Sequence, residues 1–181
     1  MLLPHSLPTL SDGDCTGKIH PCVTLTALAV TERQGRDVLT GPIVIGNLAS
    51  MLNGAPVTTQ DIDLLLRDTG LNRRKLARFA EAIGGAAPMP VSELNKVEWI
   101  EGGLAVPVEI HYDRISGGLT FSSIRSRAEV VAVGNEKLAV AALEDVIRSK
   151  RAANRPKDRA VLPILRDTLA VKKRLERPSA R

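Results

Sequence analysis

Aromatic side chains are scarce in this chain of 181 residues, where Phe, Trp and Tyr together make up 2%. A hydrophobic core must therefore be built from Leu, Val, Ile and Ala, and aromatic platforms for stacking nucleic-acid bases are not expected. The apolar fraction of 44% is nevertheless ordinary for a globular protein. The length fits one domain, or one domain with a small appendage.

Cysteines and long apolar segments are also few. Cys15 and Cys22, with His20 between them, match no metal-ligand spacing. No apolar run reaches about 18 residues, so we expect no transmembrane helix and no membrane partner. The opening MLLPHSLPTL lacks the basic and apolar regions of a signal peptide. We therefore expect a cytoplasmic protein whose cysteines are reduced.

Positive charge is in excess, with a formal net charge of +5 and a pI near 9.6. Much of it lies in residues 150–181. Two interpretations are open: a polyanionic partner such as a nucleotide or RNA, or a soluble surface whose excess charge sits in a tail.

Two regions are expected along the chain. Residues 1–40 are interrupted by Pro and Gly and are predicted to be an irregular lead-in that the rest does not need for folding. Residues 41–181 are predicted to form one domain, with an α/β core at 41–140 and C-terminal helices at 141–181.

The expected elements are defined by hydrophobic periodicity and by Gly, Asn and Pro. Strands are predicted at 42–45, 61–66, 97–100, 104–112, 128–133 and 137–140, the third and fourth forming a hairpin across 101–103. Helices are predicted at 47–52, 71–83, 143–153 and from 156 onward. This order is typical of an α+β fold with helices packed on one side of a mixed sheet.

Two acidic residues share one face of the strand predicted at 61–66. Side chains alternate along a strand, so Asp61 and Asp63 point one way and the apolar Ile62 and Leu64 the other. Mg²⁺ takes hard oxygen ligands and is usually held by one or two carboxylates plus substrate phosphates. The pair is therefore a candidate magnesium site; the alternative is solvated polar alternation on an edge strand.

A third carboxylate is predicted on a later strand. Glu109 alternates with Val108 and Ile110, so it can face the Asp pair across the sheet or face solvent. His111 shares its face, and we expect an ordinary exposed histidine there, with contact to substrate as the alternative.

Further candidates lie at the two ends of the predicted domain. The turn at Gly46 and Asn47 places backbone N–H groups at a helix N-terminus, which suits phosphate oxygens. Lys150 lies on the apolar stripe of its helix, so it must meet a phosphate or an acid, or reach water at the helix end. Arg155 and Lys157 are expected on a solvated basic face, with nucleic-acid contact as the alternative.

Two stretches resemble a known family. IVIGNLASMLNGAPVTTQDIDLLL resembles the Gly-Gly or Gly-Ser helix and Asp-x-Asp strand of the nucleotidyltransferase superfamily, which has a DNA polymerase beta-like fold. LEDVIRSKRAANRPKDRAVLPIL resembles the C-terminal helices of bacterial stand-alone members, some of which act in toxin–antitoxin systems. Together they cover roughly residues 41–170.

The resemblance implies Mg²⁺ as cofactor at Asp61, Asp63 and Glu109, with Glu109 also able to act as general base. Gly46, Asn47 and Lys150 are the nucleotide-binding candidates. The sequence departs from the family at two positions, because relatives usually have Gly or Ser in place of Asn47 and more often Asp in place of Glu109.

The predicted function is transfer of a nucleoside monophosphate from an NTP to a hydroxyl group of RNA, a protein or a small molecule. Two alternatives belong to other classes. One is a non-catalytic toxin–antitoxin partner protein on the same fold, and the other is an RNA-binding domain driven by the basic C-terminal segment.

Overall fold

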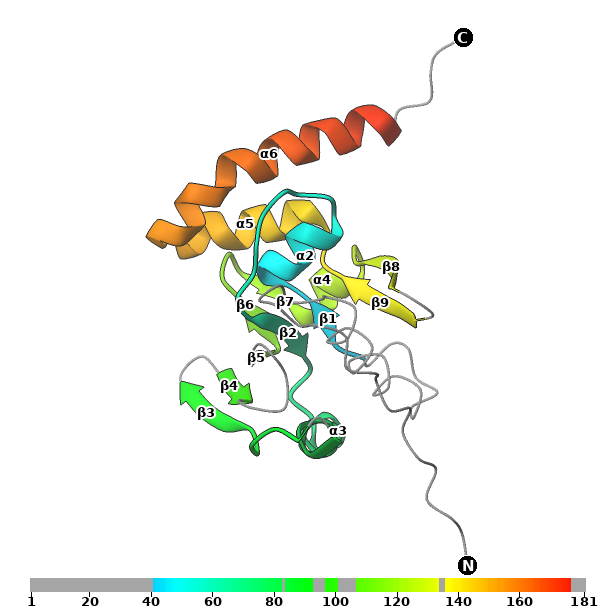
Figure 1. Cartoon of the computed structure of the whole chain (residues 1–181), viewed down its shortest axis with the longest axis vertical. Coiled ribbons are helices and arrows are strands. Elements are labelled where there is room, and N and C mark those ends of the chain that lie inside the picture. Colours follow the sequence, from blue (N-terminus) through cyan, green and yellow to red (C-terminus); the bar gives the residue numbers. More distant parts are fainter. Residues whose placement is uncertain (1–40, 83, 93–96, 101–106, 134–135, 177–181) are drawn as a thin grey trace, which may run out of the picture.

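The computed structural model describes residues 41–82, 84–92, 97–100, 107–133 and 136–176 (Figure 1). The predicted lead-in at 1–40 and the predicted connection at 101–103 lie outside these residues. No described helix is long and apolar enough to cross a membrane.

Seven strands form one sheet in the order β3-β4-β5-β2-β1-β9-β8. Pairing is parallel between β2 and β5 and between β1 and β9, and antiparallel between the other neighbours, so the sheet is mixed as predicted. The strands are β1 (Ile43–Val44), β2 (Ile62–Leu66), β3 (Met89–Ser92), β4 (Val97–Ile100), β5 (Val108–Tyr112), β8 (Glu129–Val133) and β9 (Glu136–Val140).

Three short elements lie between β5 and β8, and periodicity did not reveal them. β6 (Arg114–Ile115) and β7 (Leu119–Thr120) form a two-stranded sheet, followed by α4 (Phe121–Arg125). Thr120 caps α4 through a capping box with Ser123. Elements of two to five residues are too short to show a period, so only the cap was readable.

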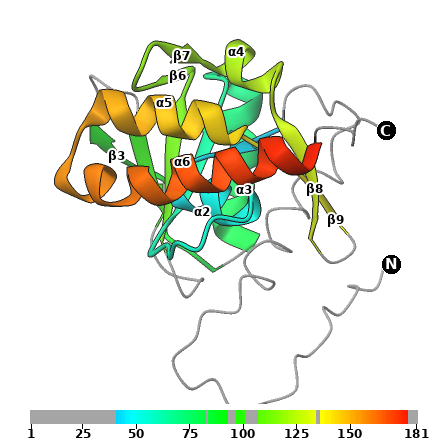
Figure 2. The same ribbon diagram turned by 90° about the horizontal axis from the view of Figure 1, so that it is seen from above.

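The longer helices lie close to their predicted positions. They are α2 (Gly46–Leu52), α3 (Gly70–Ala82), α5 (Leu143–Ala153) and α6 (Pro156–Glu176). Figures 1 and 2 show α5 and α6 side by side, and Figure 1 shows α2 between this pair and the strands. The α+β class and the C-terminal helical segment are thereby confirmed.

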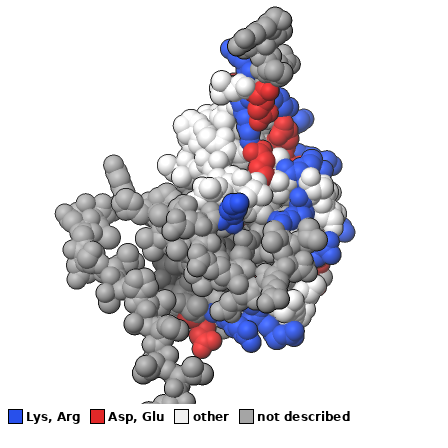
Figure 3. Space-filling view, turned by 90° about the vertical axis from the view of Figure 1, so that its right-hand side faces the viewer, with Lys and Arg blue, Asp and Glu red and all other residues white. Residues whose placement is uncertain are grey.

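The basic C-terminal segment is partly neutralised by the body of the protein. The Nζ of Lys172 lies 2.6 Å from Oε2 of Glu129, and the Nζ of Lys173 lies 3.0 Å from Oε1 of Glu144. On the face shown in Figure 3, blue and red side chains alternate at the top of the molecule, where α6 lies. This face therefore does not present a purely basic surface to a nucleic acid.

The core determines which way the candidate acids point. Val108, Ile110 and Tyr112 are buried along β5, whereas Glu109 and His111 between them are half-buried. The alternation predicted for this strand is confirmed. The fully buried neighbours fix the strand in the sheet, so the polar residues must lie on its other face.

Candidate active site

All six predicted site residues line one cavity of about 860 Å³. Its wall comes from the β1–α2 turn, β2, β5 and the corner between α5 and α6. The six are Gly46, Asn47, Asp61, Asp63, Glu109 and Lys150.

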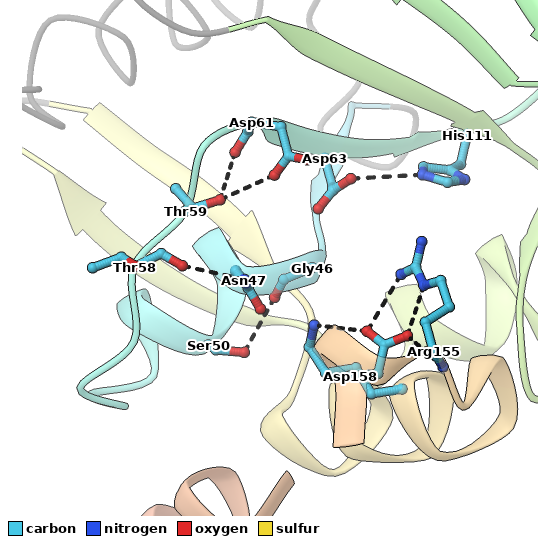
Figure 4. Close-up of polar contacts among 11 residues, drawn as sticks. Gly46, Asn47, Ser50, Thr58, Thr59, Asp61, Asp63, His111, Arg155 and Asp158 are labelled. Atoms are coloured by element: carbon cyan, nitrogen blue, oxygen red, sulfur yellow. Dashed lines mark hydrogen bonds and ion pairs between the residues drawn. The ribbon is translucent and has the colours of Figure 1, made fainter. Parts of the chain in front are cut away.

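The sheet register brings two of the acids together. Asp63 is the direct partner of Glu109 in the parallel pairing of β2 with β5. Asp61 precedes β2 and lies on the same cavity wall, where the Thr59 hydroxyl is 3.1 Å from its Oδ1 (Figure 4). Burial and the neighbouring charge of Asp63 raise the pKa of Asp61, so the folded protein disfavours a charge there.

His111 belongs to this cluster, and the expectation of an ordinary exposed histidine is wrong. Its Nε2 lies 2.9 Å from Oε1 of Glu109 and 3.7 Å from Oδ1 of Asp63. Burial alone would lower the pKa of His111, but the contacts with the two carboxylates outweigh it and raise the pKa to about 9. The same hydrogen bond, opposed by burial, lowers the pKa of Glu109.

Two of the acids and this histidine have a geometry that a cation can use. Ligand atoms of Asp63, Glu109 and His111 all lie within 4.8 Å of one another. Asp63 and Glu109 offer the hard oxygen ligands that Mg²⁺ prefers, and Asp61 offers a third from the same wall. A protonated His111 supplies positive charge to this cluster, so a cation that binds there competes with its proton.

Gly46 makes room for the carboxylate of Asp63. Its φ is +65°, and a Cβ built on it would lie 1.8 Å from Oδ2 of Asp63. The neighbouring backbone is fixed as well, because the Ile45 N–H donates to the Asp63 carbonyl at 3.0 Å. A glycine is therefore required here both for the left-handed backbone and for the close approach.

Asn47 uses its donor within the protein. Its Nδ2 donates to the Thr58 carbonyl at 3.2 Å, which ties α2 to the loop before β2 (Figure 4). Its Oδ1 is buried and has no hydrogen-bond partner among the residues that the structure describes. The departure from Gly or Ser thus adds an amide whose donor group is already engaged within the protein.

Lys150 contacts an acid, which is one of the two partners that the sequence analysis allowed. Its Nζ lies 3.4 Å from Oδ1 of Asp158, and both residues are buried. In the protein without ligand, therefore, its ammonium pairs with an acid of α6. The predicted contact with a nucleotide phosphate would have to replace or extend this pair.

Arg155 and Lys157 also line the cavity, although the sequence favoured a solvated basic face. Arg155 binds Asp158 through Nε at 2.7 Å, and Figure 4 shows its side chain between Asp158 and the strands that bear Asp63 and His111. A local pattern could have indicated this, because Pro156 begins a helix and an acid two residues later suits its first turn.

No protein-family model matches the sequence, and the search of curated proteins gave no match. Solved structures do resemble it. A lincomycin-bound lincosamide antibiotic adenylyltransferase, LnuA, is 13% identical over 83% of this chain and 98% of that chain, with a TM-score of 0.60. The antibiotic-resistance factor ANT(2'')-Ia is 14% identical over 84% and 86%, with a TM-score of 0.58.

A candidate nucleotidyltransferase from Thermotoga maritima is 20% identical over 81% of this chain and 93% of that chain, with a TM-score of 0.52. ANT(2'')-Ia has also been solved with adenylyl-2''-tobramycin, and this structure gives a TM-score of 0.57. At such identities the likeness concerns the fold. The sheet order, the glycine turn and these neighbours agree that the chain has the nucleotidyltransferase fold that its motifs predicted.

Proposed function

We propose that this protein is an enzyme that transfers a nucleoside monophosphate from an NTP to a hydroxyl group of a small molecule, with Mg²⁺ as cofactor. One observation carries the proposal: Asp61, Asp63 and Glu109 line a single cavity beside a glycine that lets the Asp63 carboxylate approach the start of α2. A structural role alone would not explain three acids gathered on one wall with a single histidine to balance them.

Each acid has a role in this reaction. Asp61, Asp63 and Glu109 would hold the ion, which when bound neutralises phosphate charge during phosphoryl transfer. Glu109, whose pKa is lowered by its hydrogen bond to His111, is ionised and can accept the proton of the acceptor hydroxyl. The acceptor oxygen forms a bond to the α-phosphorus, the bond from this phosphorus to the bridging oxygen breaks, and pyrophosphate leaves.

A small molecule is the acceptor that the observations favour. LnuA is described as a lincosamide antibiotic adenylyltransferase, and ANT(2'')-Ia was solved with an adenylylated tobramycin. A cavity of about 860 Å³ is within the usual range for a small-molecule site. An RNA acceptor would instead call for basic and aromatic surfaces, and α6 is partly neutralised by Glu129 and Glu144.

The test is direct transfer of label. The full-length protein is incubated with each α-³²P-labelled NTP, Mg²⁺ and separate acceptor pools: hydroxyl-bearing small molecules that include lincosamides and aminoglycosides, total RNA, and cell protein. We expect label in a small-molecule product and release of pyrophosphate. Label in RNA or protein would show that the acceptor is not a small molecule. No label in any pool would favour the non-catalytic toxin–antitoxin partner.

Two variants make the assay specific for the site. Asp63→Asn removes a carboxylate from the cavity wall and should abolish transfer. Asp167→Asn makes the same chemical change on the exposed surface of α6, outside the cavity, and should leave transfer unchanged. Equal activity of the two variants would place the chemistry elsewhere.

A further inference from the structure

The corner between α5 and α6 carries more positive charge than its own acid neutralises. Asp158 is fully buried and accepts from Arg155 through Oδ2 at 2.7 Å and from Lys150 through Oδ1 at 3.4 Å. One carboxylate therefore faces two cations. Lys157, the next residue before it, is exposed and adds a third.

The backbone of this corner is fixed by the same acid. Asn154 takes a left-handed conformation with φ of 51°, which ends α5, and Pro156 begins α6. The backbone N–H of Arg155 donates to Oδ2 of Asp158 at 3.3 Å, as in one half of a capping box. The position of Arg155 is thus set through both its backbone and its side chain.

Arg155 retains a free donor group for a ligand. Its Nε and Nη2 bind Asp158, whereas Nη1 has no hydrogen-bond partner in the part of the chain that the structure describes. In Figure 4 the guanidinium reaches from the corner between α5 and α6 toward the side of the cavity where Asp63 and His111 lie. Among the causes that lower the pKa of Glu109, after the hydrogen bond from His111, are the charges of Lys157 and Arg155 across the cavity.

We propose that this corner is a polyphosphate-binding subsite, in which Arg155 and Lys157 bind the β- and γ-phosphates of the NTP and Asp158 positions Arg155. The inference rests on the proposed function and names residues that it did not require. The acidic wall attracts a cation and repels free phosphates, so the phosphates beyond the α-phosphate need a cationic partner on the opposite side. The exposed basic residues on the cavity wall are Arg114, Arg155 and Lys157, and of these Arg155 and Lys157 lie at the α5–α6 corner.

Binding of inorganic tripolyphosphate and of AMP tests the subsite without any turnover. Both are titrated into the full-length protein with Mg²⁺ by isothermal calorimetry. Lys157→Gln changes an exposed residue and should fold normally. We expect its Kd for tripolyphosphate to rise by about tenfold or more, the usual effect of losing a charge-assisted hydrogen bond. Its Kd for AMP, which lacks the β- and γ-phosphates, should change by less than about twofold.

Lys137→Gln is the matched control, because Lys137 is an exposed lysine of β9 that does not line the cavity. It should leave both affinities unchanged. The subsite is wrong if Lys157→Gln and Lys137→Gln bind tripolyphosphate equally, or if Lys157→Gln loses AMP and tripolyphosphate to the same extent.

Asp158→Asn tests positioning by the sign of its effect. If only net charge mattered, removing a carboxylate would tighten tripolyphosphate binding. If Asp158 holds Arg155 in place, binding weakens and AMP affinity is unchanged; tighter binding would overturn the positioning role. Should this variant fail to fold, Arg155→Gln removes the positioned group directly and must weaken tripolyphosphate binding.

The outcomes also separate the subsite from the proposed function. If tripolyphosphate binding depends on Lys157 but the protein has no transfer activity, the subsite is supported and the proposed enzymatic function is wrong. If the Lys157→Gln variant transfers label with an unchanged KM for NTP, the proposed enzymatic function is supported and the subsite is wrong.

Discussion

The two walls of the cavity, one formed by strands β2 and β5 and the other by the corner between α5 and α6, carry opposite charges. On the strand wall, Asp61, Asp63 and Glu109 lie together and a single histidine balances them, and burial with the charge of Asp63 raises the pKa of Asp61. On the helix wall, the buried Asp158 has two cationic partners, and the charge of Arg155 lowers its pKa against the effect of burial. The buried acid of the helix wall is neutralised within the protein, with positive charge left over, whereas the three acids of the strand wall share one histidine and gain further positive charge when a cation binds.

The largest effect should come from breaking the strand wall. Asp63→Asn should reduce transfer by about 10²–10³-fold, as does loss of one preorganised electrostatic contact in other enzymes. It should also abolish the rise in melting temperature that Mg²⁺ with NTP produces by mass action. The unfolding temperature of the ligand-free protein should change little, because removing one of three like charges offsets the lost contact with His111.

Differential scanning fluorimetry with and without Mg²⁺ and NTP measures this, with Asp167→Asn as control. A rise in the variant equal to that of the unsubstituted protein would remove Asp63 from the metal site.

Gly46→Ala should lower the stability of the protein and displace the Asp63 carboxylate of the same wall. An alanine at φ +65° costs about 1–2 kcal/mol in backbone strain alone. Its Cβ would also meet Oδ2 of Asp63, so the carboxylate must move and Mg²⁺ binding should be lost.

Gly118→Ala separates the two contributions. Gly118 has a φ of +68° and nothing within 4 Å of its added Cβ, so this variant carries the strain without the clash. Urea unfolding of both variants should show a larger loss for Gly46→Ala, together with loss of Mg²⁺ binding in that variant alone. Equal losses and intact Mg²⁺ binding would show that Asp63 adapts.

Substitution of the two lysines sharpens the contrast on the helix wall. Lys150→Met keeps the apolar stem but leaves Asp158 with Arg155 alone, so the free energy of unfolding should fall by about 1–3 kcal/mol. Lys157→Met alters an exposed residue and should change the free energy of unfolding by less than about 0.5 kcal/mol. Urea unfolding compares them; a loss of NTP affinity in Lys150→Met at unchanged stability would restore the predicted phosphate contact.

Patterns with a clear period carried the fold prediction. Alternation located Asp63 and Glu109 on strands that the structure pairs, with Asp61 just before the first of them, and a helical stripe located Lys150 on the buried side of α5. These predictions held because the apolar residues that define a period also determine which side of an element is buried.

Partners were harder to predict than positions. The acid that binds Lys150 lies on the next helix, and the contact arises from the α5–α6 corner rather than from any spacing along α5. His111 was misjudged partly for the same reason, because one of its two carboxylate partners, Asp63, lies on a neighbouring strand. Its other partner, Glu109, lies two residues before it on the same face of β5, so alternation could have indicated that contact.

A pH dependence should arise from His111, and its effect should be small well below pH 6.5. Its folded-state pKa of about 9 exceeds the ordinary value of 6.5, so the protonated form stabilises the fold. This stabilisation is fully present below pH 6.5 and is lost as the pH rises through about 9, and its size is at most about 3 kcal/mol. Mg²⁺ affinity should change in the opposite direction and increase over the same range, because the imidazolium and the cation compete for Asp63 and Glu109.

His111→Gln provides the reference for this pH dependence. Other groups that titrate between pH 6.5 and 9 are common to both proteins, so the difference in unfolding free energy isolates His111. Urea unfolding and Mg²⁺ titration at half-unit steps of pH should give a difference that falls toward pH 9, while Mg²⁺ affinity rises only in the protein with His111. If the difference stays constant, folding does not change the pKa of His111, and the carboxylates of the strand wall do not stabilise its charge.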